Sequence, residues 1–170
     1  SEERGVYRTR DGGASWARVL YLDEDTGAIQ VEFDPQDPDT VYASLWQHRD
    51  GPWENADFTG PNSGLYKSTD GGETWRRIGE GLPGAAEGLG RIGIGIARSN
   101  PERVYATVGA REGAGIYRSD DAGATWQRVS TDERVWGRPG DFGEIRVHPA
   151  NPDVVYAGNI AAYRSDDAGE

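Results

Sequence analysis

The sequence predicts an all-β protein in which short strands form four-stranded antiparallel blades of a β-propeller, with about three blades in this chain. Two recurring phrases predict this fold. A ten-residue phrase occupies residues 7–16, 66–75 and 117–126, and a shortened copy occupies residues 163–170. Between the copies, an apolar strand, an Asn/Asp-Pro turn and a Val-Tyr-Ala strand also recur. A repeat of roughly 50 residues indicates propeller blades or solenoid coils. Four strands per repeat favour the propeller.

The ten-residue phrase has the chemistry of a strand, a tight turn and a second strand. Its core reads Ser/Thr-x-Asp-x-Gly-x-Ser/Thr-Trp. The carboxylate can accept hydrogen bonds from backbone N–H groups of the turn, and the glycine can adopt a positive φ. The tryptophan can bury its ring against the hairpin. Because the same residues recur at the same turn, we interpret them as structural rather than catalytic or metal-binding: Asp11, Trp16, Asp70, Trp75, Asp121, Trp126 and Asp167.

In chain order, residues 1–21 are predicted to form half a blade, its third and fourth strands. Residues 28–80 and 90–131 each form a whole blade, and residues 142–170 supply the first three strands of another. Each blade begins with an alternating apolar strand and a proline turn, since proline cannot donate to a sheet ladder and marks the hairpin tip. The acidic segment 22–27 connects the first two units. A calcium loop is the alternative there, because Asp23 and Asp25 have the spacing of its first two ligands, but the next ligand position holds Gly27.

These phrases resemble the bacterial Asp-box (BNR) repeat proteins, often labelled sortilin-like or glycosyl-hydrolase-like, over essentially the whole chain. The resemblance implies that the box is a hairpin staple between the third and fourth strands of a blade. It also implies an extracytoplasmic, secreted or periplasmic protein. Function does not transfer with a fold, so the resemblance leaves the activity open.

Composition excludes several classes of function. The 18 basic and 29 acidic residues give a net charge of −11, which opposes binding to nucleic acid. No apolar run approaches the ~20 residues that span a bilayer, so we expect no membrane insertion. Cysteine is absent, which excludes disulfides and thiolate sites. His48 and His148 are interpreted as surface or turn residues, and we expect neither a metal nor a cofactor.

Ligand contacts are predicted on the loops that vary in length. Propeller topology places the proline turns and the boxes on one face, and the variable loops on the opposite face around the channel mouth. Two of those loops combine tryptophan with charged residues, which suits stacking on sugars or gripping peptides. The alternative is that these tryptophans pin long loops to the blades. The candidate ligand-binding residues are Arg49, Trp53, Glu54, Arg134, Trp136 and Arg138.

Two functions fit the sequence. The first is a non-catalytic binding or scaffold propeller whose partner is a protein, a peptide or a glycan. The second is a glycoside hydrolase, sialidase-like or xyloglucanase-like, with part of its catalytic residues outside this chain. Such an enzyme needs two carboxylates across a cleft, and the loop candidates are Asp25, Asp50, Glu54 and Asp141. The Arg-Ile-Pro phrase of sialidases is missing, and residues 91–93 read Arg-Ile-Gly.

The strand pattern also predicts open blade edges at both ends of the chain. The predicted strands number thirteen, in units of two, four, four and three. Unpaired edges and apolar blade faces favour association. We therefore expect the remaining blades to come from a parent chain or from self-association.

Overall fold

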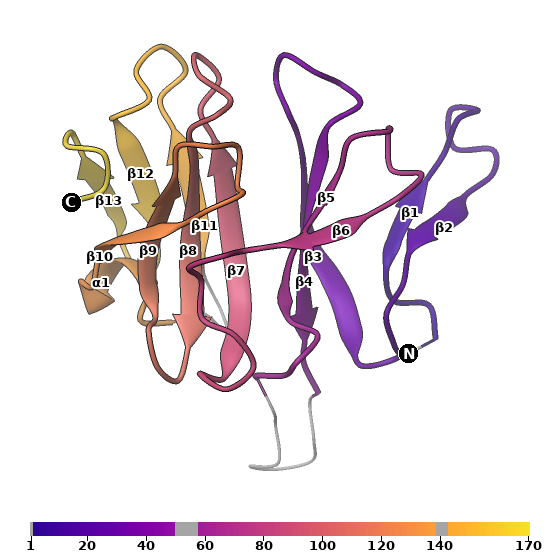
Figure 1. Cartoon of the computed structure of the whole chain (residues 1–170), viewed down its shortest axis with the longest axis horizontal. Coiled ribbons are helices and arrows are strands. Elements are labelled where there is room, and N and C mark those ends of the chain that lie inside the picture. The colour runs from indigo at the N-terminus through magenta and orange to yellow at the C-terminus, as the bar shows by residue number, and fades with distance from the viewer. Residues whose placement is uncertain (1, 50–57, 139–142) are drawn as a thin grey trace.

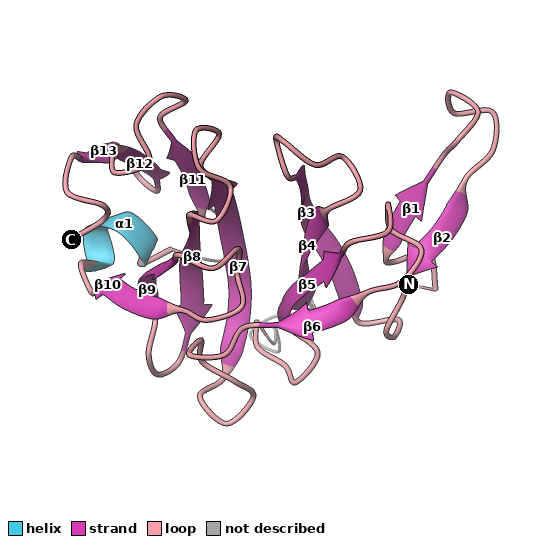
Figure 2. Cartoon of the chain, turned by 45° about the horizontal axis from the view of Figure 1, so that its top comes forward, coloured by secondary structure: helices cyan, strands magenta, loops and turns pink. Residues whose placement is uncertain are grey.

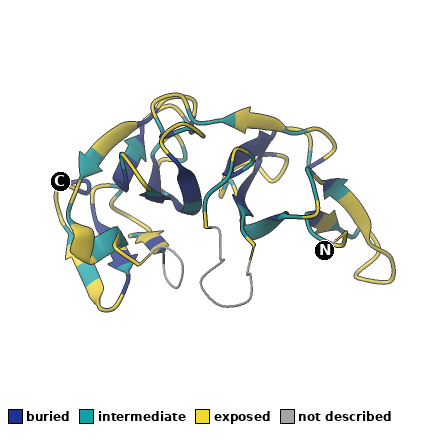
Figure 3. Cartoon of the chain, turned by 90° about the horizontal axis from the view of Figure 1, so that it is seen from below, coloured by how far each residue is buried: buried dark blue, intermediate teal, exposed yellow. Residues whose placement is uncertain are grey.

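The computed structural model describes residues 2–49, 58–138 and 143–170, and within them thirteen strands form four antiparallel sheets. The sheets stand side by side, with the N-terminal and C-terminal sheets at opposite ends (Figure 1). Seen from below, they fan into an arc (Figure 3). The predicted fold class, an all-β partial propeller, is confirmed.

The four sheets follow the chain order. The first contains β1 (Val6–Arg8) and β2 (Ala17–Leu20). The second contains β3 (Thr26–Phe33), β4 (Val41–Gln47), β5 (Gly64–Ser68) and β6 (Arg76–Ile78). The third contains β7 (Leu89–Ile96), β8 (Val104–Ala110), β9 (Gly115–Ser119) and β10 (Gln127–Ser130). The fourth contains β11 (Glu144–Val147), β12 (Val155–Gly158) and β13 (Ala162–Ser165). Neighbouring strands in each sheet are consecutive in the chain.

Two details differ from the sequence-based expectation. Strand β3 begins at Thr26, inside the segment predicted as an acidic connection. The loop after β10 contains a one-turn helix, α1 (Glu133–Trp136), which Asp132 caps by accepting a hydrogen bond from the Arg134 N–H (Figure 2). In the described part of the chain this is the one helix, and it is far shorter than a membrane span requires.

The first three boxes form the predicted hairpin turn. In the second box, the Asp70 carboxylate accepts hydrogen bonds from the Thr74 N–H at 2.9 Å and from the Thr74 hydroxyl at 2.5 Å. The Ser68 hydroxyl accepts from the Gly72 N–H at 2.8 Å. The indole N–H of Trp75 donates to the Gly72 carbonyl at 3.2 Å. The same pattern recurs around Asp121, and around Asp11 without a tryptophan bond. These aspartates bond within their own turns, and their structural role stays a prediction.

The residue after each box aspartate ties the box to the proline turn of its own sheet. Its N–H donates at 2.8 Å to a turn carbonyl in all three sheets that have both parts: Gly71 to Asp39, Ala122 to Glu102, and Ala168 to Asp153. This residue has a positive φ in every box, even where it is alanine, 55° at Ala122 and 62° at Ala168. Boxes and proline turns thus lie on one face, as predicted.

Consecutive sheets are joined by contacts to the next box. The Ala122 carbonyl of the third box accepts from the Tyr42 hydroxyl at 2.9 Å and from the Lys67 ammonium at 3.0 Å, both in the second sheet. Arg8 of the first sheet donates in the same way to the Gly71 carbonyl at 2.6 Å. Apolar side chains fill the space beneath these contacts, and Trp126 lies in the largest cluster, with Tyr42, Leu65 and Ile94.

Candidate functional site

The loops between second and third strands meet the connections between sheets on the face opposite the boxes. The His48 N–H donates to the Asp25 carbonyl at 3.1 Å. In the same way, the Gly60 N–H donates to the Leu89 carbonyl at 3.1 Å, and the Glu112 N–H donates to the Glu87 carbonyl at 3.0 Å. Each bond joins a loop that follows a second strand to a segment at the start of a first strand. We call this side the loop face, and it is where the sequence predicts ligand contacts.

An aromatic cluster lies on the loop face at the end of β4. The rings of Trp46 and His48 stack with centroids 4.2 Å apart, and Phe58 stacks on His48 at 5.0 Å. The indole N–H of Trp46 donates to the Phe58 carbonyl at 2.8 Å, which fixes the returning loop against the strand. Trp46 is buried, whereas Phe58 is 49% exposed. The cluster therefore presents one open aromatic ring on a rigid base.

A hollow of about 150 Å³ borders this cluster, and the sheets on either side both contribute to it. Trp46 and Phe58 form one wall, and Arg91 and Arg111 of the third sheet form the other. The Arg91 guanidinium lies 6.0 Å from the Trp46 ring centroid. Pockets that enclose small molecules measure roughly 300–1,000 Å³. This hollow suits contact with one face of a ligand rather than enclosure of a whole one.

The carboxylates of the connection from β2 to β3 are held by partners. Arg49 donates to both oxygens of Asp25, at 2.9 and 2.7 Å. Asn62 donates to Asp23 at 2.6 Å. Burial works to raise the pKa of Asp23, but hydrogen bonds from Thr26, Asn62 and the Asp25 N–H outweigh burial and hold the pKa below its usual range. Asp23 is therefore an ionised carboxylate at neutral pH, suited to accept hydrogen bonds and not to act as an acid.

The predicted ligand-binding residues lie on two separate loops. Arg49 follows β4 and pairs with Asp25. Arg134 and Trp136 lie in α1, between the third and fourth sheets, where Arg134 bonds to Asp132 at 2.9 Å. That pairing lowers the pKa of Asp132 to about 2. Arg138 is exposed just beyond α1. Trp53, Glu54, Asp50 and Asp141 lie outside the described residues.

Sequence reasoning missed the aromatic cluster. It assigned His48 to the surface or a turn, yet the ring is half-buried between Trp46 and Phe58. One local signal was present, because residues two apart on a strand point to the same side, which places Trp46 and His48 together. The contribution of Phe58 depends on where its loop returns, which the spacing alone does not reveal.

The sequence profile of the BNR/Asp-box repeat family matches residues 66–77 and 117–128, the second and third boxes. The chain carries BNR/Asp-box repeats. Its curated relatives include the xyloglucanase Xgh74A of Acetivibrio thermocellus, 30% identical over 97% of this chain, and a xyloglucanase of Hypocrea jecorina, 32% identical over 75%. The Asp-box repeat protein spans only 22% and 15% of the lengths of these two relatives.

Solved structures of propeller proteins resemble this Asp-box repeat protein. The GH74 xyloglucanase from Xanthomonas campestris matches 99% of this chain with 24% of its own, with a TM-score of 0.71 and 19% identity. A structure of YCF48 bound to D1 peptide matches 89% of this chain with 40% of its own, with a TM-score of 0.58 and 16% identity. At these identities the likeness shows the fold alone.

Proposed function

We propose that this chain is a section of a glycoside hydrolase propeller and that its loop face binds a xyloglucan-type polysaccharide. The observation that carries the proposal is the cluster of Trp46, His48 and Phe58, which presents a half-exposed ring beside Arg91 and Arg111. The relatives named xyloglucanases support the choice of glycan. The extracytoplasmic location expected from the sequence fits this substrate, since plant polysaccharides lie outside cells.

The chemistry of the cluster suits a sugar. A sugar ring offers an apolar face of C–H groups and an edge of hydroxyls. An open aromatic ring can cover the face, while guanidinium N–H groups can donate to the hydroxyls. The Trp46 indole is already bonded to the Phe58 carbonyl, so the platform needs little reordering when the ligand arrives.

The proposed role of this section is substrate binding. Glycoside hydrolysis needs one carboxyl group that stays protonated and a second that is ionised. In the described part of the chain, every carboxyl group whose pKa departs from its ordinary value departs downward: Asp11, Asp23, Asp70, Asp121 and Asp132. These groups suit the ionised role and not that of the acid.

A binding or scaffold propeller for a peptide is the second candidate. It is favoured by the fold shared with YCF48 bound to D1 peptide and by the exposed side chain of Arg134. In that case Arg49 and Arg134 would contact an acidic peptide. The two candidates differ in the class of ligand that the loop face retains.

Affinity electrophoresis in gels that contain soluble xyloglucan tests the proposal. We expect the polysaccharide to retard the protein, and Phe58→Ala to weaken the interaction by about tenfold, roughly the loss of one stacking contact. Phe33→Ala is the matched control, since Phe33 is also exposed but lies at the proline-turn end of β3. The proposed site would be contradicted if xyloglucan retarded Phe58→Ala as much as the unmodified protein. It would also be contradicted if Phe58→Ala and Phe33→Ala lost the same amount of retardation.

A further inference from the structure

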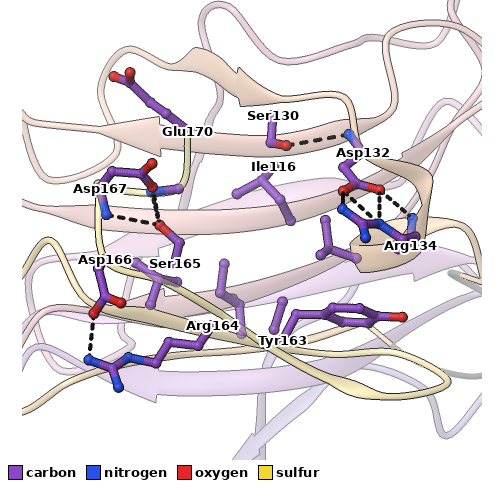
Figure 4. Close-up of a pocket in the computed structure, with 15 residues that line it drawn as sticks. Ile116, Ser130, Asp132, Arg134, Tyr163, Arg164, Ser165, Asp166, Asp167 and Glu170 are labelled. Atoms are coloured by element: carbon purple, nitrogen blue, oxygen red, sulfur yellow. Dashed lines mark hydrogen bonds and ion pairs between the residues drawn. The ribbon is translucent and has the colours of Figure 1, made fainter.

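Arg4 lies just before the first sheet, yet its guanidinium reaches the loop face of the second. Its Nη1 atom donates to the Asp25 carbonyl and, at 2.8 Å, to the His48 carbonyl, which are 21 and 44 residues away in the sequence. The Arg4 side chain is half-buried. In contrast, Arg134 bonds within its own loop to Asp132, two residues away (Figure 4). The Arg4 contacts therefore join separate parts of the fold.

The backbone around Arg4 directs its side chain to this place. Gly5 has a φ of 127°, and a Cβ atom built on it would lie 2.3 Å from the Leu20 carbonyl oxygen. Only glycine allows this approach. Because Leu20 ends β2, Gly5 brings Arg4 against the connection that leads to β3. A Cβ atom on Gly27 would lie 3.7 Å from the Arg4 Cδ atom, so the arginine stem packs along the start of β3.

The contacts of Arg4 fix a backbone that the sheet does not hold. Strand β4 ends at Gln47, so the ladder stops before His48. The His48 N–H donates instead to the Asp25 carbonyl at 3.1 Å, and the His48 carbonyl accepts from Arg4. The same Asp25 carbonyl also accepts from Arg4. The three residues thus form a closed set of hydrogen bonds around the His48 backbone.

The His48 ring is the middle layer of the aromatic cluster. It stacks on Trp46 with centroids 4.2 Å apart, and Phe58 stacks on it at 5.0 Å. A shift of the His48 backbone would therefore move the ring on which the half-exposed Phe58 rests. Binding geometry of this kind depends on the residues that support the contacting side chains.

We propose that Arg4 is a positioning residue for the aromatic cluster, through which the first sheet takes part in ligand binding without touching the ligand. The inference rests on the proposed glycan function and deepens it. A guanidinium suits this role because it is always charged, offers several N–H donors in a fixed plane and accepts no hydrogen bond. Its two acceptors come from the connection before β3 and from the loop after β4, so one side chain sets their separation.

Three variants test the inference. Arg4→Met keeps an apolar stem without the donor, and in gels that contain xyloglucan it should bind about fivefold more weakly, roughly the effect of one lost hydrogen bond. Arg4→Lys keeps a charged donor and should bind within about twofold of the unmodified protein. Arg8→Met is the matched control, because Arg8 also joins the first sheet to the second, at the Gly71 carbonyl, but on the face of the boxes. It should lower the melting temperature and leave the affinity unchanged.

Nuclear magnetic resonance gives a readout that does not depend on the glycan. The resonances of the Trp46 indole N–H and of the His48 ring should shift in Arg4→Met and stay in place in Arg8→Met. The inference is wrong if these resonances do not move in Arg4→Met, or if Arg8→Met weakens glycan binding as much as Arg4→Met does. If xyloglucan does not retard the unmodified protein, the proposed function fails, and the resonances alone decide whether Arg4 positions the cluster.

Discussion

At the scale of single residues, the box aspartates act as acceptors that stay ionised. Asp70 is exposed, yet hydrogen bonds from the Thr74 hydroxyl, the Thr74 N–H and the Ser68 hydroxyl lower its pKa to about 2. The same causes lower the pKa of Asp121 to about 2. Because the charged form makes these bonds, protonation of the carboxyl group weakens the turn.

The pH dependence of stability should report this effect at Asp70. A lowered folded-state pKa contributes stability that is present above the ordinary value of 3.8 and is lost as the pH falls through about 2. The melting temperature of Asp70→Asn should therefore lie below that of the unmodified protein at neutral pH, and the difference should shrink between pH 4 and pH 2. Thr74→Val, which removes one donor, should move this narrowing to higher pH. A difference that stays constant down to pH 2 would contradict the assignment.

At the scale of elements, the junction between the second and third sheets depends on one carbonyl. Tyr42 and Lys67 come from β4 and β5 and donate to the same Ala122 oxygen, and the Lys67 ammonium lies 4.8 Å from the Tyr42 ring centroid. Burial raises the pKa of Tyr42 and lowers that of Lys67, which indicates how far the junction excludes water. Either donor alone can still satisfy the carbonyl.

A double-mutant cycle should reveal this shared acceptor. Tyr42→Phe and Lys67→Met should each lower the free energy of unfolding by about 1 kcal/mol. The double variant should lose more than the sum of the two single losses, because the partly buried Ala122 carbonyl then has neither donor. Denaturant unfolding measures each step. Tyr105→Phe combined with Lys67→Met is the control, since Tyr105 donates to the Pro152 carbonyl. The two losses of unfolding free energy in this control pair should add within about 0.5 kcal/mol. If the losses also add for Tyr42→Phe with Lys67→Met, the two donors are not coupled through the Ala122 carbonyl.

The elements also show where sequence reasoning succeeds. The box turns and proline turns could be predicted because their partners are neighbours in sequence, as Asp70 and Thr74 are. The junction donors could not, because Tyr42 and Ala122 are 80 residues apart. A basic residue follows each box tyrosine in the sequence, but only the packed sheets show that Arg8 and Lys67 reach the next box. The aromatic cluster escaped prediction for the same reason, since Phe58 arrives from a long loop.

At the scale of the whole molecule, burial is greatest in the middle of the arc. Strands β4 and β8 are buried over nearly their full length, whereas β2 and β13 are largely exposed. The equivalent tryptophans follow the same trend, with Trp16 61% exposed and Trp126 7% exposed. Yellow segments accordingly mark both ends of the arc, and dark blue its inner strands (Figure 3).

Hydrogen exchange should follow this gradient. Amides with few buried contacts open at low free energy, while central strands open only in global unfolding. Mass spectrometry should therefore find the slowest exchange in β4 and β8 and the fastest in β1, β2 and β13. Uniform protection over all four sheets would show that the arc unfolds as one unit and that the differences in burial do not change the free energy of local opening.

In the second and third boxes, the carbonyl of the residue after the aspartate accepts hydrogen bonds from the sheet before it, and its N–H donates to the proline turn of its own sheet. The second repeat therefore carries both halves of one coupling, because its Gly71 carbonyl accepts from Arg8 of the first sheet and its Tyr42 and Lys67 donate to Ala122 of the third. If the gene segment that encodes such a repeat were duplicated, the two adjacent copies would again be joined by the same acceptor carbonyl and the same donors. A copy of the second repeat could therefore be inserted beside itself without redesign of this coupling.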